Sequence, residues 1–492
     1  MAQYFTAQFT GGMNEVIAPS LLDEKTASLL VNADIESGKI RSIKLPKLLP
    51  VEKPEDLNHY GKINRSVAKM YGRTYWSINN TLNAPYYGGN VENYLGVPYP
   101  DYDNEVVFLK QPDGDLTGNY KYCVTYVNAN GWESAPGAVL DYERSIVLES
   151  NYVDITVKWT DDRISYAKIY RTQAEGADFY CVGEVKSSGD TFTDKTSDYT
   201  LAGLEPLSTI DNYPPPDRGK YLCESGNVFF LAVDSTLYFS KQGNPHAWPK
   251  LNFIGFDDVI TGICPEFQGI LVFTSNSTYR ITGAENVETL IKSQLPGNQG
   301  CVNYNSIDQI SNAPIWLSND GICLWNGENI NVISKQVMNT TRLQVICAAS
   351  ANDCYYLFLK DGAILYDHRN GDVFRKLDFS CDYAWYDGTS DILYLQDWNG
   401  ISAFGLGEYG VYTYKTGYIG VPESEYTYFR EVILTIDGNA NVTFVNEGIA
   451  VFSVSLKKSG KYRLKSPYNT LGRYAELKVI GTGTLKELGV IM

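Results

Sequence analysis

The chain alternates short apolar runs with short polar turns, and one such unit recurs along its middle. The unit is an apolar run, a polar turn and a second apolar run, as in PIWLSNDGICLWNG at residues 314–327. The five copies have their turns at Asp234, Asn276, Asp320, Asp361 and Asp397, at intervals of 42, 44, 41 and 36 residues. Such an interval is typical of a four-stranded propeller blade, and a sustained helical period is lacking. Runs that are apolar throughout, such as VFFLAV and CYYLFL, suit strands packed between neighbouring sheets. A β-propeller is therefore predicted for residues 206–410.

An earlier hairpin of the same pattern predicts an insertion between two blades. Its sequence, SVAKMYGRTYWSINNTL, has its turn at Gly72, 162 residues before Asp234. The runs between residues 118 and 196 have the strand spacing of a fibronectin type III sandwich, with Trp159 and Tyr170 as candidate core aromatic residues. The segment YPPP follows as a stiff hinge.

Four domains are predicted from these patterns. They are an N-terminal segment with the first blade or blades (1–97), the fibronectin-like insert (98–205), the remaining blades (206–410), and a small β domain that closes the propeller in part (411–492). The segments FTGGMNEVIAPSLL and ASLLVNADIESGKIRSI are expected to add strands to the propeller.

Composition supports an all-β fold. The chain has 492 residues, with 38 tyrosines and 43 glycines against 5 methionines, which favours strands and tight turns. No apolar run approaches the length of a spanning helix, and the N-terminus lacks a signal-peptide pattern, so a soluble protein made in a cytoplasm is expected. The nine cysteines have no metal-ligand spacing and are expected to be buried, reduced thiols.

The charge distribution supplies the candidate contact site. The net charge of −16 argues against a sequence-reading nucleic-acid binder. Residues 411–492 hold 10 Lys and Arg against 7 Asp and Glu, a balance of +3, which leaves −19 on the rest. The candidate subunit or DNA contact residues are Lys457, Lys458, Lys461, Arg463, Lys465 and Arg473. They either protect an exposed hairpin edge, or contact an acidic neighbouring subunit or passing phosphate.

The motifs of enzyme chemistry are not matched. An Asp box of sialidase propellers resembles Ser-x-Asp-x-Gly-x-Thr-Trp, whereas Asp320 and Gly321 are adjacent and fit a hairpin turn. The GxGxxG pattern at 405–410 precedes a β-like run rather than a helix. The three histidines, His59, His246 and His368, are too scattered for zinc, and the acidic loops at 101–105 and 397–400 are better read as solvated turns than as calcium sites. No catalytic residue, cofactor or metal site is predicted, and the chain is not expected to be an enzyme.

Four stretches carry a family resemblance: GKYLCESGNVFFLAVDSTLYFSKQGNPHAWP, GILVFTSNSTYRITG, GNQGCVNYNSI and WLSNDGICLWNGENINVIS. With the N-terminal FTGGMNEVIAPSLL and LLVNADIESGKIRSI, they cover residues 1–50 and 206–350. They resemble the propeller region of tail nozzle or tail-hub proteins of short-tailed bacteriophages, a group that includes packaged-DNA stabilisation proteins.

The resemblance implies a structural virion protein, assembled in the host cytoplasm. It implies a homohexameric ring below the portal and adaptor proteins, with a channel that retains double-stranded DNA and then conducts it without sequence specificity during ejection. The host envelope at the tail tip is a further partner. Two alternatives stay open on the same fold: an adhesin that binds host-surface glycan through tyrosine-rich loops, and a glycoside hydrolase, which requires paired carboxylates.

Overall fold

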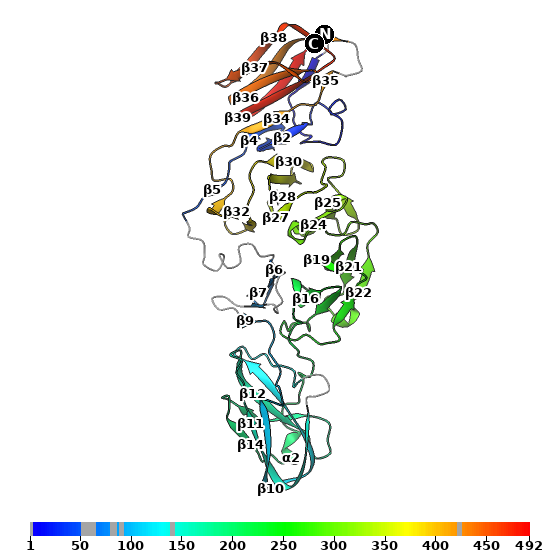
Figure 1. The fold of residues 1–492 in the computed structure, drawn as a ribbon, viewed down its shortest axis with the longest axis vertical. Coiled ribbons are helices and arrows are strands. Elements are labelled where there is room, and N and C mark those ends of the chain that lie inside the picture. Colours follow the sequence, from blue (N-terminus) through cyan, green and yellow to red (C-terminus); the bar gives the residue numbers. More distant parts are fainter. Residues whose placement is uncertain (1–2, 51–64, 79–85, 88–92, 138–142, 421–425) are drawn as a thin grey trace. The chain divides into compact units, whose positions relative to one another are not determined.

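The computed structural model describes residues 3–50, 65–78, 86–87, 93–137, 143–420 and 426–492. Regular structure in these ranges is almost wholly β-strand, and the α-helix α2 (Asp198–Leu201) is a single turn (Figure 1). The all-β prediction is confirmed. No helix among the described residues is long and apolar enough to cross a membrane.

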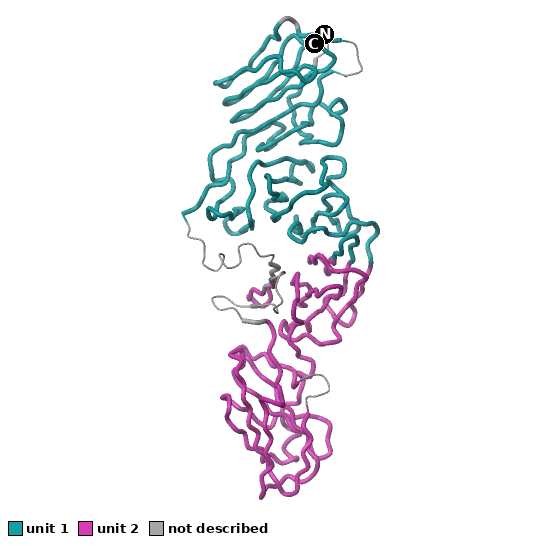
Figure 2. The backbone as a smooth tube through the Cα atoms, in the orientation of Figure 1, with its two compact units in different colours: residues 1–62, 273–279, 294–492 teal, residues 63–272, 280–293 magenta. Residues whose placement is uncertain are grey.

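The chain forms two compact units (Figure 2). The first comprises residues 1–62, 273–279 and 294–492, and the second residues 63–272 and 280–293. The predicted boundaries after residues 97, 205 and 410 stay a prediction.

The described residues contain six antiparallel groups of four strands; the inserted sheet separates the first group from the second in sequence, and the fifth group is part of a larger 14-stranded sheet. The first three are β6 (Arg65–Met70), β7 (Arg73–Ile78), β8 (Tyr86–Tyr87) and β9 (Asn93–Tyr94); β15 (Lys220–Ser225), β16 (Val228–Val233), β17 (Thr236–Phe239) and β18 (Phe253–Gly255); and β19 (Ile260–Glu266), β20 (Gly269–Thr274), β21 (Thr278–Thr282) and β22 (Ile291–Gln294). The last three are β23 (Asp308–Ile310), β24 (Ala313–Ser318), β25 (Gly321–Trp325) and β26 (Ile330–Val332); β27 (Val345–Ala351), β28 (Cys354–Leu359), β29 (Gly362–Asp367) and β30 (Val373–Leu377); and β31 (Tyr383–Asp387), β32 (Ile392–Asp397) and β33 (Gly400–Ala403) with β5 (Lys47–Leu48).

A four-stranded antiparallel sheet is the repeating unit of a β-propeller. Its recurrence along this chain is what the sequence period predicts. All five marker turns join the second and third strands of their sheets, whereas Gly72 joins the first and second described strands of the earliest sheet. The second strands β16, β20, β24 and β28 are buried on nearly every residue, on both faces. A strand reads as continuously apolar because sheets cover both of its faces.

The N-terminal segment adds strands to sheets formed far along the chain. Strand β2 (Leu29–Val31) lies between β30, to which it is parallel, and β34 (Tyr412–Lys415), and β5 pairs with β33. Strand β1 (Gln3–Thr6) and the hairpin of β3 (Ala33–Glu36) and β4 (Lys39–Ser42) join the C-terminal strand β39 (Tyr474–Ile491). Of the two segments expected to supply propeller strands, 27–43 contributes β2 beside β30, whereas 9–22, which the structure describes in full, contains no strand; β5, which completes the sixth sheet, lies outside both segments.

The C-terminal β region is built on one long two-stranded ribbon. Strand β36 (Thr427–Asn446) pairs with β39 from Glu431 to Asn446. The other edge of β36 pairs with β38 (Gly460–Gly472) over its first half and with β37 (Ile449–Leu456) over its second half. The short strand β35 (Ile419–Gly420) also pairs with β39. This region belongs to the same 14-stranded sheet as β27 to β30, to which β34 and β2 connect it.

We expect Gly483→Ala to destabilise this ribbon by about 1–3 kcal/mol or more. Gly483 faces Gly438 across the ribbon with φ +97°, and an added Cβ would lie 1.9 Å from the Asp437 carbonyl oxygen. The matched control is Gly448→Ala, at φ +82° in open space, where only the left-handed backbone costs about 1 kcal/mol. Hydrogen exchange of peptides from β36 and β39 measures both; equal protection in the two variants would contradict the close approach.

The inserted region differs from the predicted fibronectin type III sandwich, which is not confirmed. Its described strands form one sheet, in the order β13 (Tyr180–Val185), β12 (Ile164–Arg171), β10 (Val106–Asn128), β11 (Arg144–Val157) and β14 (Thr191–Asp194). The reason is that β10 and β11 stay paired along their length, through a register shift between Gln111 and Leu116, instead of separating into two sheets. Tyr170 is buried as predicted, and Trp159 packs on the core at its edge.

Candidate functional site

Five of the six predicted cationic residues are exposed on β38 and on the turn before it. Lys457 and Lys458 form the turn between β37 and β38. Lys461, Arg463 and Lys465 are every second residue at the start of β38. All five are exposed, since every second residue of a strand points to the same face. We call these five residues the cationic row.

Arg473 is separate from the cationic row. It follows the far end of β38, where its guanidinium lies over the ring of Tyr426, 4.9 Å from the centroid, and its backbone N–H donates to Glu447. The prediction grouped six residues because they are close in sequence, but the length of β38 carries Arg473 away from the turn.

Neighbouring carboxylates neutralise part of the cationic row. Lys461 Nζ lies 3.3 Å from Glu487 Oε2, and Arg463 Nη1 lies 3.9 Å from Glu431 Oε2. A hydrogen bond from Thr435 and then Lys461 hold the pKa of Glu487 below its usual range, against the effect of burial. Among the described residues, Lys457, Lys458 and Lys465 form no ion pair. These three ammonium groups give the row an uncompensated positive charge that can contact an anionic surface.

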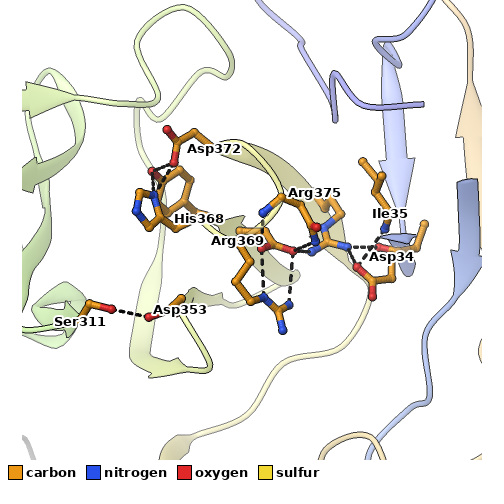
Figure 3. Close-up of polar contacts among 12 residues, drawn as sticks. Asp34, Ile35, Ser311, Asp353, His368, Arg369, Asp372 and Arg375 are labelled. Atoms are coloured by element: carbon orange, nitrogen blue, oxygen red, sulfur yellow. Dashed lines mark hydrogen bonds and ion pairs between the residues drawn. The ribbon is translucent and has the colours of Figure 1, made fainter. Parts of the chain in front are cut away.

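A buried ionic cluster between β3 and the β29–β30 hairpin was not anticipated from the sequence (Figure 3). The side chains of Arg375 and Asp367 are 1% and 0% exposed, and Arg375 also contacts Asp34 and donates to the Ala33 carbonyl oxygen at 3.1 Å. It therefore fastens β3 of the N-terminal segment to the β29–β30 hairpin. The available signal was an Arg and an Asp within otherwise apolar runs, ILYD and VFRKL.

The cluster has the electrostatics of a structural clamp. Burial alone raises the pKa of Asp367, but Arg375 and hydrogen bonds from Arg369 and Asn370 outweigh it and hold that pKa below its usual range. Arg369 Nε lies 3.3 Å from Asp367 Oδ1, and Asn370 Nδ2 lies 2.8 Å from Oδ2. Both carboxylate oxygens of Asp367 accept hydrogen bonds from protein groups. The cluster therefore holds strands together and does not present a ligand-binding site.

The histidines occupy unrelated places. His368 Nδ1 lies 2.5 Å from Asp372 Oδ1 in the turn after β29, and Tyr366 donates to the same carboxylate oxygen at 2.6 Å (Figure 3). His246 is buried, accepts a hydrogen bond from Gly96 N–H at 3.1 Å, and has its pKa lowered to about 3, chiefly by burial. His59 lies outside the described residues. Within those residues, no three His, Cys, Asp or Glu side chains group to hold a metal ion.

The remaining sequence motifs are structural. Asp320 and Gly321 form the turn between β24 and β25, where Gly321 has φ +138°. The glycine loop 405–410 holds the N-terminal segment: Gly407 and Gly410 donate backbone hydrogen bonds to the carbonyl oxygens of Leu45 and Ile43, both at 2.8 Å. Asp101 accepts hydrogen bonds from the Asn104 side chain and the Asp103 backbone, which lower its pKa. All nine cysteines are free thiols, and eight are buried.

Comparisons with known proteins add no family. No protein-family model matches the chain, and no curated protein matches it. Solved structures similar to it include BamB from Moraxella catarrhalis, with 10% identity, coverage of 73% of this chain and 99% of that one, and a TM-score of 0.30. The Pan2 WD40 domain of Neurospora crassa has 11% identity, coverage of 65% and 86%, and a TM-score of 0.29. An exo-β-1,3-galactanase from Phanerochaete chrysosporium has 9% identity, coverage of 87% and 95%, and a TM-score of 0.20. The propeller assignment therefore rests on the four-stranded sheets themselves.

Proposed function

We propose that this chain is a structural, non-enzymatic subunit of the tail nozzle or hub of a short-tailed bacteriophage. In this proposal, six copies form a ring below the portal and adaptor proteins, and the ring channel retains and then conducts the DNA genome. The protein is assembled in the host cytoplasm and resides in the virion. The observation that carries the proposal is the separation of charge between the cationic row and the rest of the chain.

Charge separation supports head-to-tail assembly. Residues outside 411–492 have a balance of −19, whereas the cationic row exposes Lys457, Lys458 and Lys465 without ion pairs among the described residues. A closed ring of identical copies needs two different, complementary surfaces on each copy. An acidic surface on one copy and the cationic row of the next meet this requirement, and their attraction favours the correct register.

The resemblance to nozzle proteins gives further support. Three of its segments contain strands of successive sheets: β15 to β17, β20 and β21, and the end of β24 with β25 and β26. The N-terminal segments of the same resemblance contain β2, β3 and β4. The resemblance thus includes strands of several sheets together with the connecting segments 9–22 and 297–307.

The same charge distribution suits a DNA conduit. A ring of strongly acidic subunits repels phosphates, so duplex DNA passes without adhering to the wall. We expect the purified protein to bind no double-stranded DNA at about 0.15 M salt, where surface attraction is already screened beyond about 8 Å.

The test of assembly is a charge reversal of the cationic row. We expect wild-type protein to form rings visible by negative-stain electron microscopy and measurable by mass photometry. The triple variant K457E/K458E/K465E should raise the protein concentration needed for assembly by at least about tenfold, because three attractive contacts become repulsive. The control K110E/K186E/K195E changes three exposed lysines of the inserted sheet by the same charge and should assemble as wild type does.

The outcomes separate the proposal from its alternatives. Protein that stays monomeric at all concentrations, or cryo-electron microscopy of virions with the chain away from the tail axis, would overturn the proposal. Binding of DNA that the triple variant abolishes would assign the row to DNA instead of a subunit. Hydrolysis of host polysaccharide that is lost on changing one carboxylate would favour a glycoside hydrolase.

A further inference from the structure

The second unit contains an aromatic cleft beside the polyproline segment. Its cavity measures about 570 Å³, within the range of roughly 300–1,000 Å³ that small-molecule sites occupy. Four aromatic side chains line it, with two cationic ones at the rim: Tyr99, Tyr213, Tyr238, Trp248, Arg163 and Lys250. We call this cavity the aromatic cleft.

The backbone around the aromatic cleft is fixed by hydrogen bonds. The segments that enter and leave the inserted sheet lie side by side, where Gly96 has φ +93° and an added Cβ would lie 2.7 Å from Pro214. The Trp248 backbone N–H donates to the Tyr213 carbonyl oxygen at 2.8 Å, and the Gly96 backbone N–H donates to His246 Nδ1 at 3.1 Å. The proline run Pro214–Pro216 stiffens one wall. The site is therefore formed before any ligand enters, which lowers the entropic cost of binding.

The aromatic rings and the lysine act on the same space. Trp248 and Tyr213 are buried in the floor, and Tyr99 and Tyr238 keep part of their rings accessible. The exposed Lys250 has its ammonium 4.4 Å from the Tyr213 ring centroid and 6.0 Å from that of Tyr99. No described carboxylate forms an ion pair with it. A ligand that packs on these rings therefore lies close to the Lys250 ammonium group.

The other charged groups of the cleft are Arg163 and Asp217. The guanidinium of Arg163 is held by Asp161, with Nε to Oδ1 at 2.9 Å and Nη2 to Oδ2 at 2.6 Å, so its position is fixed and its charge partly offset. Asp217 lies exposed at the rim, where its carboxylate can accept hydrogen bonds from hydroxyl groups. The cleft therefore combines ring faces, a free cation and a hydroxyl acceptor.

We propose that the aromatic cleft binds a carboxylate-bearing saccharide. The apolar C–H face of a sugar ring packs on Tyr99 and Tyr238, as amphipathic rings permit, the carboxylate pairs with Lys250, and Asp217 accepts from hydroxyl groups. A polyproline peptide also suits an aromatic-lined groove, but it brings no negative charge to Lys250. This inference does not depend on the role of the cationic row or on ring assembly.

The test is binding of acidic sugars against their neutral counterparts. The probes are oligogalacturonate and N-acetylneuraminic acid, with oligogalactose and a proline-rich peptide for comparison, detected by ligand-observed NMR with the full chain. We expect the acidic sugars to bind with a dissociation constant of about a millimolar or tighter. Lys250→Gln should weaken this binding by about tenfold, and Tyr238→Ala should weaken acidic and neutral sugars alike.

The matched control is Lys195→Gln in the inserted sheet. Lys195 lies over the ring of Tyr152, 4.4 Å from its centroid, in the same geometry as Lys250 but outside the cleft. Wild-type affinity in Lys195→Gln with loss in Lys250→Gln supports the proposal. Absence of binding by both acidic probes, equal affinity in Lys250→Gln, or preference for the proline-rich peptide would each overturn it.

Discussion

Replacing Arg375 by methionine is expected to destabilise the first unit by about 3–5 kcal/mol, because it leaves the Asp367 carboxylate buried without its principal cation. Asp367 is 0% exposed and Arg375 is 1% exposed. Arg369 still contacts Asp367 in the variant, so we expect the lower end of this range. Denaturant unfolding, with hydrogen exchange of peptides from β29, β30 and β3, measures the loss and shows where it occurs.

The pH dependence of stability should reverse in this variant. In the wild type the pKa of Asp367 is below its unfolded value of about 3.9. Its contribution to stability is therefore present above that value and is lost as pH falls through the lower folded pKa. Without Arg375, burial raises the folded pKa above the unfolded one. Stability from this group then decreases as pH rises from about 4 toward 7.

The control for Arg375 is the other arginine on the same carboxylate. Arg369 contacts Asp367 from a position that is 44% exposed, so Arg369→Met should cost no more than about 1 kcal/mol. Adding Asp367→Asn to Arg375→Met should recover part of the loss, because it removes the unpaired charge. A loss in Arg375→Met no greater than in Arg369→Met would exclude the buried pair as the clamp between β3 and the β29–β30 hairpin.

Local patterns in the sequence predict the sheets, but not their long-range connections. The turns at Asp234, Asp320 and Asp361 are set by residues that adopt hairpin geometry and by apolar neighbours, both of which are visible within a dozen positions. The pairing of β5 with β33 joins residues 47–48 to residues 402–403. No local pattern encodes such a partner, since it is chosen by packing of the complete chain.

The candidate site likewise has features that the local sequence predicts and features that depend on the complete fold. Alternation along β38 predicts one face for Lys461, Arg463 and Lys465, because a strand has a period of two. The separation of Arg473 depends on where β38 ends, and the contact of Arg375 with Asp34 spans 341 positions. The predicted sandwich of the insert is not confirmed for a related reason: strand spacing alone does not show whether two long strands stay paired or part into two sheets.

Replacing Trp316 by alanine is expected to cost about 3–5 kcal/mol, the range for truncating a large buried aromatic side chain. Trp316 is 0% exposed in β24, and its ring centroid lies 4.8 Å from that of Phe273 in β20. Its indole N–H donates to the Gln299 carbonyl oxygen at 3.1 Å. The truncation therefore opens a cavity between two consecutive sheets and removes one of two hydrogen bonds that the Gln299 carbonyl oxygen accepts; the Thr278 hydroxyl still donates to it at 2.7 Å.

The distribution of the damage tests whether consecutive sheets depend on each other. If Trp316 joins them, Trp316→Ala should reduce hydrogen-exchange protection in peptides from β20 as well as from β24 and β25. Trp316→Phe keeps an aromatic contact with Phe273 but loses the hydrogen bond, so its effect should be intermediate. Trp398, which is 81% exposed, is the control, and Trp398→Ala should change stability by no more than about 0.5 kcal/mol. Loss of protection confined to β24 and β25 would mean that each sheet is stable by itself, whereas a propeller blade is stabilised largely by the sheet beside it.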